Sequence, residues 1–215
     1  MLPRLHALAQ VARFKRRKSR DDRARAVGED APDRHLPHLQ GQPQNGLQAA
    51  QKNVDALPPL QETLLPHEGH DEVIIDELWT FVWSKRHAAW IWIVLSRRNL
   101  QVLAFFVGKR DLHSAEQLWK QVPLPWRRDL VFTDGYRVYQ ALLQHNPIQH
   151  CRCLKRDPDT WGETSAVEGT NNALRQGVSY LTRKSLAFAR SLHWLQVRLH
   201  WFIHHWNLRQ AKKWG

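Results

Sequence analysis

Two adjacent carboxylates, Asp76 and Glu77, lie in the middle of the apolar stretch VIIDELWTFVW, residues 73–83. The stretch is typical of a buried β-strand, yet Asp and Glu are poor strand formers and a buried, unpaired carboxylate is costly. Either the strand lies at a sheet edge with its acids in water, or one acid is held there for chemistry. Alternate residues of a strand point to opposite faces, and both faces here are apolar, so periodicity does not choose between the two acids.

Two further acids stand at positions that could bring them to the same place. Asp134 ends the short apolar stretch DLVFTDG, and Glu168 lies in the helix-like segment ETSAVEGTNNALRQGVSYL. In an open α/β sheet, strand ends and an adjacent helix converge on one crevice, where ligands bind. Converging carboxylates repel one another unless cations lie among them, and oxygen ligands of this kind suit Mg²⁺ or Mn²⁺. Two such ions, about 4 Å apart, can activate an attacking water or hydroxyl and stabilise a leaving 3′ oxygen.

The charge of the chain favours a polyanionic partner. The formal net charge is +12 and the isoelectric point is near 10.3, which makes nucleic acid the expected partner. Beyond Glu168 the sequence has no Asp or Glu but eight Lys or Arg, as expected of a DNA-facing surface. A basic chain with three clustered acids indicates phosphodiester chemistry. No apolar run is long enough to cross a bilayer, and the N-terminus lacks the charge order of a secretory signal, so we expect a cytoplasmic protein without membrane contact.

The pattern from residue 71 onward predicts a mixed α/β domain. Three apolar, β-branched and aromatic runs predict an antiparallel meander, and helical and strand-like segments then alternate up to a long C-terminal helix. Trp79, Trp90 and Trp92 are expected to fill its core. The strands are expected within 73–83, 88–98, 100–110, 129–135 and 148–154, and the helices within 111–122, 136–146, 163–181 and 185–209.

Residues 1–70 have a different composition. Phe14 is the only aromatic residue before position 71, whereas all eleven Trp lie at or beyond Trp79, and seven of the eleven Pro fall in this first segment. A segment with so little apolar surface cannot offset the entropy lost on ordering. We therefore expect two parts, a basic and disordered segment 1–70 and a catalytic domain 71–215.

Four motifs resemble those of a bacterial DDE transposase of the insertion-sequence-one family, in its catalytic, InsB-like part. They are DELWTFV (76–82), FTDGYRVY (132–139), VEGTNNALR (167–175) and TRKSLAFARS (182–191). The resemblance implies an RNase H-like core whose catalytic and metal-binding acids are Asp76, Asp134 and Glu168, so that Asp76 rather than Glu77 is catalytic. It also implies metal-dependent cleavage at transposon ends, after which the exposed 3′-OH groups attack target DNA.

Supporting residues follow from helix geometry. Asn172 and Arg175 lie four and seven residues after Glu168, on the same helix face, where they could contact a carboxylate or the DNA backbone. Arg183 and Lys184 are further candidates for phosphate contacts, although a solvated basic patch explains this pair equally well.

The resemblance leaves one part of the family unmatched. Such transposases are expected to carry an N-terminal zinc module and a helix-turn-helix, which residues 1–70 lack, and we hypothesise that this segment is read from the wrong frame of an upstream region. Two alternatives to a complete transposase stay open: an RNase H-like nuclease without strand transfer, and a non-catalytic DNA-binding fragment. Because two transposon ends must be held together, a homodimer on DNA is expected.

Overall fold

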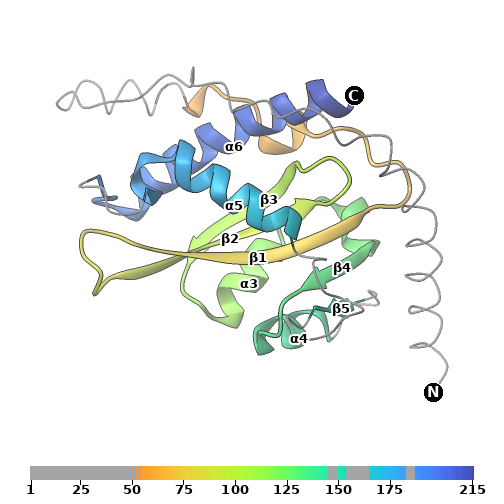
Figure 1. The fold of residues 1–215 in the computed structure, drawn as a ribbon, viewed down its shortest axis with the longest axis horizontal. Helices are drawn as coiled ribbons and strands as arrows, with labels where there is room; N and C mark the ends of the chain where they lie inside the picture. The colour runs from red at the N-terminus through yellow and green to blue at the C-terminus, as the bar shows by residue number, and fades with distance from the viewer. Residues whose placement is uncertain (1–51, 53, 145–149, 154–164, 183–186) are drawn as a thin grey trace. The chain divides into compact units, whose positions relative to one another are not determined.

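The computed structural model describes residues 52, 54–144, 150–153, 165–182 and 187–215. Every described residue belongs to one compact unit of the chain, Leu39–Gly215. The elements follow the predicted order (Figure 1). They are β1 (Glu72–Phe81), β2 (Ala88–Ser96), β3 (Val102–Gly108), α3 (Leu112–Trp119), β4 (Leu130–Thr133), α4 (Arg137–Leu143), β5 (His150–Arg152), α5 (Ser165–Gly177) and α6 (Leu192–Trp214), with the 3-10 helices η2 (Leu60–Thr63), η3 (Leu124–Arg128) and η4 (Ser179–Leu181).

The five strands form one mixed sheet in the order β3-β2-β1-β4-β5. The strands β1, β2 and β3 make the expected antiparallel meander, whereas β4 pairs with β1, and β5 with β4, in parallel. Parallel neighbours require crossover connections, and α3 and α4 lie in the connections that lead to β4 and β5. An antiparallel meander extended by two parallel strands, with helices on both faces, is an RNase H-like core, which confirms the predicted fold class.

Different helices cover the two faces of the sheet. The helices α3 and α4 lie on one side, and α5 and α6 cross the other (Figure 1). On the first side Val73, Ile75 and Trp92 join the buried residues of α3 and α4 in a common core. Because side chains alternate along a strand, Ile74 and Leu78 of β1 belong to the second side, which α5 contacts. The central strand is therefore buried on both faces, as its nearly continuous apolar sequence indicates.

The last helix begins later than the sequence pattern predicts. The pattern extends back to residue 185, but α6 starts at Leu192, with the Ser191 side chain accepting a hydrogen bond from the Trp194 N–H. Just before α6 the chain pairs with the end of β1 instead of forming a helix. Ala189 forms a parallel bridge with Val82, and the Ala189 carbonyl accepts a hydrogen bond from the Trp83 N–H at 2.7 Å. Tertiary pairing thus overrides helical periodicity at this end.

Residues 54–70, nearly all of the described part of the segment predicted to be disordered, pack onto the rest of the domain. Val54, Leu60 and Thr63 are buried, and η2 packs against α6. The Asn207 side chain of α6 donates to Thr63 Oγ1 at 3.0 Å, and Gln101 Nε2 donates to the Thr63 carbonyl at 2.8 Å. The folded part therefore begins before residue 71, because a few apolar side chains and buried hydrogen bonds dock this segment. Residues 1–51 and 53 lie outside the described residues.

The predicted core tryptophans divide between the inside and the surface. Trp92 is fully buried, Trp90 is partly buried, and Trp79 is 39% exposed, which corrects the expectation for that residue. Trp79 lies near the end of β1, where the hairpin to β2 extends beyond the covering helices. Among the described residues, no helix combines the length and the apolar character that a membrane span requires.

Candidate active site

The register of the parallel pair β1–β4 brings Asp76 and Asp134 together. The last pairs are Val73 with Val131 and Ile74 with Phe132, so two residues further on each strand reaches an aspartate. Residues opposite one another on neighbouring parallel strands point to the same face of the sheet, and the negative charge of Asp134 does act on Asp76. Two of the three predicted acids are thus adjacent.

The Asp76 carboxylate lies in a largely buried, acidic environment. Burial and the charges of Glu77 and Asp134 raise its pKa from 3.8 to about 6, against hydrogen bonds from the Glu77 backbone N–H and the Asn171 amide. Desolvation, the largest cause, disfavours the charged form of any acid. An ionised Asp76 is therefore costly in this protein until a positive charge arrives beside it.

The Asp134 side chain is fixed by the turn that follows β4. Its Oδ1 accepts a hydrogen bond from the Tyr136 backbone N–H at 2.8 Å, as Asp side chains do in turns of this kind. The same turn leads directly into α4, which begins at Arg137. The carboxylate is consequently held by short local contacts at the C-terminal end of a parallel strand.

Glu168 is placed differently from the two aspartates. It is an exposed residue in the first turn of α5, three positions before Asn171, whose Nδ2 donates to Asp76 Oδ2 at 2.8 Å. Residues three apart lie on one side of a helix, so Asn171 brings this side of α5 to Asp76. Within the described residues, however, no three acid, His or Cys side chains gather closely enough to hold a metal ion, so Glu168 does not complete a cluster with the aspartates.

Asn171 is the residue that the sequence reasoning missed. The spacing from Glu168 predicts Asn172 and Arg175 as supporting residues, but the amide that reaches a predicted catalytic acid is that of Asn171. Its Oδ1 is buried and has no hydrogen-bond partner in the described part of the chain. The i+3 spacing from Glu168 was the available signal, since positions three and four residues apart share a helix face equally well.

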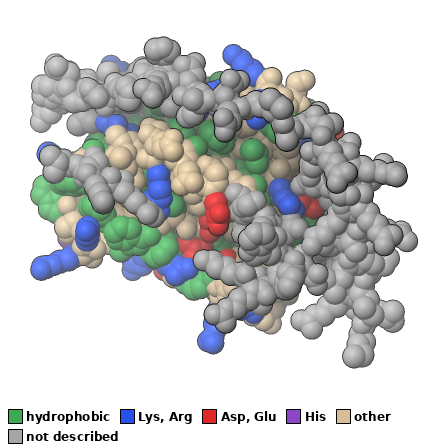
Figure 2. Space-filling view, in the orientation of Figure 1, with side chains coloured by type: hydrophobic (Ala, Val, Ile, Leu, Met, Phe, Trp, Pro, Cys, Tyr) green, Lys and Arg blue, Asp and Glu red, His purple; other side chains and the backbone are tan. Residues whose placement is uncertain are grey.

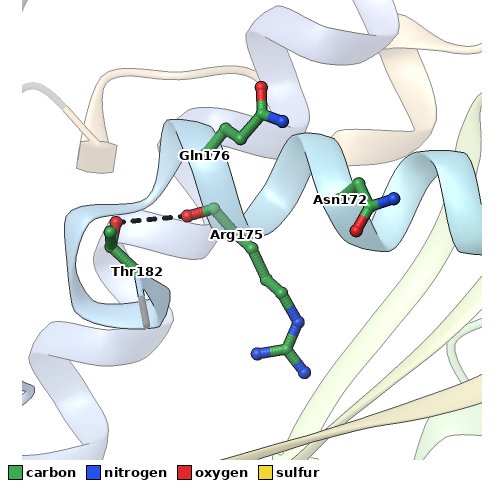
Figure 3. A pocket seen from close by; sticks show the side chains of 4 residues that line it. All are labelled: Asn172, Arg175, Gln176 and Thr182. Atoms are coloured by element: carbon green, nitrogen blue, oxygen red, sulfur yellow. Dashed lines mark hydrogen bonds between the residues drawn. The ribbon is translucent and has the colours of Figure 1, made fainter. Parts of the chain in front are cut away.

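Asn172 and Arg175 line a polar hollow of about 470 Å³ at the C-terminal part of α5, together with Gln176 and Thr182. Figure 3 shows Arg175 extending away from the helix axis, on a different side from the Gln176 amide. The Thr182 hydroxyl donates to the Arg175 carbonyl at 3.2 Å, which ties the following turn to the helix. The other two predicted DNA contacts, Arg183 and Lys184, lie outside the described residues.

One face of the molecule combines these features. Acidic side chains gather near the centre of the view in Figure 2, in the region where Figure 1 draws β1 and α5, and basic side chains lie around them. An acidic centre within a basic surround suits cations at the centre and a polyanion across the surface.

Comparison with known protein families gives a match over most of this region. The sequence model of the family described as IS1 transposase matches residues 72–207, which include β1, α5 and most of α6. The InsB protein of insertion element IS1 2 from Escherichia coli K12 is 26% identical over 159 residues, covering 73% of this chain and 87% of the relative. The InsB protein of iso-IS1n from Shigella dysenteriae is 27% identical over 120 residues, covering 55% and 82%.

Solved structures show only a distant likeness. The HTLV-2 integrase catalytic core domain in complex with magnesium has a TM-score of 0.40 and 14% identity, covering 67% of this chain and 84% of that chain. The Mos1 mariner paired end complex with Mn has a TM-score of 0.37 and 10% identity, covering 93% and 67%. The fold assignment therefore rests on the strand order, and the assignment to a family rests on the sequence match. The chain belongs to the IS1 transposase family.

Proposed function

We propose that Asp76, Asp134 and Glu168 are the catalytic acids with which this transposase cleaves and joins DNA strands. The observation that carries the proposal is the β1–β4 register, which sets Asp76, in the middle of β1, beside Asp134, which directly follows the C-terminal end of β4. This is the position at which α/β sheets present functional side chains to a ligand. Glu168 is the third acid because its helix is bound to the same site through Asn171.

The residues present fit a divalent metal such as Mg²⁺ or Mn²⁺, and we propose two ions. Asp76 and Asp134 supply carboxylate oxygens, and the repulsion that helps to raise the Asp76 pKa is the kind that a cation relieves. Asn171 Oδ1, for which the described residues offer no hydrogen-bond partner, is a further oxygen ligand next to Asp76. When bound, the ions would activate the attacking water or hydroxyl and stabilise the leaving oxygen.

The protein's own residues supply position and charge. Asp76 and Asp134 are held by hydrogen bonds from Asn171 and Tyr136, so their oxygens are fixed before substrate arrives. Arg175 and Asn172, which line the hollow on α5, are the residues that we propose contact the DNA backbone, Arg175 by charge and Asn172 by a hydrogen bond. Arg183 and Lys184, outside the described residues, stay predicted phosphate contacts.

The assembly around the catalytic domain is also a proposal. We place the domain's start at or before Val54 rather than at Asp71, and the packing of residues 54–70 counts against a wrong reading frame for that part. DNA is the substrate, both as transposon ends and as target. A cytoplasmic homodimer is the simplest assembly that holds two ends together.

The test is cleavage and joining of labelled transposon-end DNA with Mg²⁺ or Mn²⁺, using the full chain. Asp134→Asn and Glu168→Gln should each lose at least about 100-fold in rate, as expected when metal and acid positioning carry the reaction. Glu116→Gln, an exposed acid on α3, is the matched control and should behave as the unaltered protein.

The other outcomes of this experiment would support one of the two alternative functions or contradict the assignment of the acids. Cleavage without joined products would indicate a nuclease without strand transfer. DNA binding without metal-dependent cleavage would indicate a non-catalytic DNA-binding fragment. Full activity of Asp134→Asn would contradict the assignment of the catalytic acids.

A further inference from the structure

Glu77, the acid next to Asp76, is the second acidic side chain that interrupts β1. Its side chain is only 2% exposed, and it lies on the opposite face of the strand, toward α3 and α4. A carboxylate at such depth is retained only where donors satisfy it. Burial raises the pKa of Glu77, against hydrogen bonds from Tyr139 and Arg110.

Two elements donate to the Glu77 carboxylate. The Tyr139 hydroxyl of α4 donates to Oε2, and the Arg110 guanidinium, just after β3, donates to Oε1 through Nε at 2.8 Å and through a second nitrogen. Charge-assisted hydrogen bonds of this kind are stronger than neutral ones. Glu77 thus joins the central strand to the end of β3 and to the helix that follows Asp134.

The Arg110 guanidinium is held between two aromatic rings. Its central carbon lies 4.6 Å from the centroid of the Trp90 ring and 4.2 Å from that of Tyr136. The Tyr136 hydroxyl donates to the Arg110 carbonyl at 2.8 Å, so ring and backbone are both fixed. An arginine stacked and paired in this way has little freedom to move.

Through these contacts Glu77, Arg110 and Tyr136 connect the two proposed catalytic aspartates on the side of the sheet that α3 and α4 cover. Tyr136, which stacks on Arg110, donates its backbone N–H to Asp134 Oδ1 at 2.8 Å. At the other end, the Glu77 backbone N–H donates to the Asp76 carboxylate. We call Glu77, Arg110 and Tyr136 the positioning chain, since it runs from the peptide beside Asp76 to the N–H that holds Asp134.

We propose that Glu77 and Arg110 are positioning residues that fix the separation of Asp76 and Asp134 and so prepare the site for metal. The inference rests on the proposed function of the two aspartates and adds a purpose for the second acid of the pair. Neither residue touches substrate in this account, because both act through Tyr136 and the β1 backbone. Outer residues that orient metal-binding side chains typically contribute about 10- to 100-fold in affinity or activity.

The test uses Glu77→Gln in the full chain, with Glu72→Gln as the matched control. Glu72 lies on the same strand, four residues before Asp76, and pairs with Arg97 at 2.6 Å. Arg97 also covers an aromatic ring, that of Phe132, so the control pair resembles Glu77 and Arg110 in its chemistry. The readouts are Mn²⁺ affinity without DNA, kcat and KM for labelled transposon-end DNA, and thermal unfolding.

We expect Glu77→Gln to weaken Mn²⁺ binding and to lower kcat by about tenfold or more, with KM for DNA nearly unchanged. Glu72→Gln should keep the Mn²⁺ affinity and kcat of the unaltered protein. A folded Glu77→Gln protein with unaltered Mn²⁺ affinity and kcat would overturn the inference and leave Glu77 with a purely structural role.

Arg110→Lys keeps the inference testable if Glu77→Gln does not fold. Arg110 is 39% exposed, and lysine keeps the charge but loses the paired donors and the flat stacking surface. It should weaken Mn²⁺ binding in the same direction, and the double variant Glu77→Gln/Arg110→Lys should lose little more than either single one. If the losses of Mn²⁺ affinity in the two single variants add up in the double variant, Glu77 and Arg110 do not act through one chain of contacts, and the inference is overturned.

Failure of this inference is distinguishable from failure of the proposed function. If Asp134→Asn abolishes metal binding and cleavage while Glu77→Gln and Arg110→Lys change neither, only the inference fails. If Asp134→Asn itself leaves both intact, the proposed site fails, whatever the variants of the positioning chain do.

Discussion

The acids carried by the sheet and the acid carried by α5 are held in different ways. Asp76 and Asp134 are set by strand register and by short hydrogen bonds, whereas Glu168 is an exposed residue of a helix first turn. Its position depends on the packing of α5 through buried Leu174 and on the contact of Asn171 with Asp76. In the proposed site, strand register thus positions the two aspartates, whereas the packing of α5 determines where Glu168 lies relative to them.

The strongest test of this comparison is stability. Asp76→Asn removes a buried acid whose pKa of about 6 lies above its ordinary 3.8, so the ionised form costs up to about 3 kcal/mol of unfolding free energy. That cost is complete above pH 6 and disappears below about pH 4, so the variant should be more stable at pH 7.5 and equally stable near pH 4. Urea unfolding at both values measures it.

Glu168→Gln is the counterpart on the helix. An exposed acid lacks the desolvation that burial imposes, so this variant should unfold as the unaltered protein does at both pH values. A gain in stability for Glu168→Gln equal to that for Asp76→Asn would contradict the distinction between the aspartates and Glu168.

The docking of α5 can be disturbed directly at its last residue. A Cβ on Gly177 would lie 2.0 Å from Phe202 Cε2 of α6, so Gly177→Ala should lower the free energy of unfolding by about 2 kcal/mol. Urea denaturation monitors the change, and Phe202→Leu in the same chain should restore part of it. Gly169→Ala on the same helix is the control, because no atom lies within 4 Å of its added Cβ. Equal stability of the two variants would contradict the close α5–α6 contact.

The raised pKa of Asp76 on β1 also predicts how the metal affinity of the protein depends on pH. Since the metal requires ionised Asp76, Mn²⁺ affinity of the DNA-free protein should be nearly constant above pH 6 and fall about tenfold per pH unit below it. Titration with Mn²⁺ between pH 5 and 8 checks this. Glu168→Gln should keep the same midpoint, and a constant affinity from pH 5 to 7 would remove Asp76 from the site.

The smallest effect is expected at the hydrogen bond between Asn171 of α5 and Asp76 of β1. Asn171→Ala removes one hydrogen bond to Asp76, worth about 1 kcal/mol, and should weaken Mn²⁺ binding about fivefold. Asn172→Ala, which removes an exposed neighbour, should leave Mn²⁺ affinity unchanged and affect only DNA affinity, measured as a function of salt. Equal Mn²⁺ affinities for the two variants would mean that Asn171 does not hold Asp76 for metal.

The sequence predicts those features that depend on local pattern. The alternation of strands and helices and the end of a short strand beside Asp134 are local features, and the structure agrees with both. The sequence does not predict which side of a helix faces which strand. The example is α5, where Asn171 rather than Asn172 donates a hydrogen bond to Asp76. Long-range polar contacts were equally hidden, since Glu77 and Arg110 are 33 positions apart in the chain.

The hydrogen bonds among Thr63, Gln101 and Asn207 have a consequence for assembly. The Asn207 side chain donates to Thr63 and to the Val102 carbonyl, and Gln101 donates to the carbonyls of Thr63 and Asn207. These hydrogen bonds attach the segment before β1, residues 54–70, to the sheet and to α6, so it is not a flexible connection to the domain. A recognition module joined upstream would therefore be tethered from Val54 rather than from Asp71, and the anchoring of residues 54–70 shortens the reach from which its effective concentration follows.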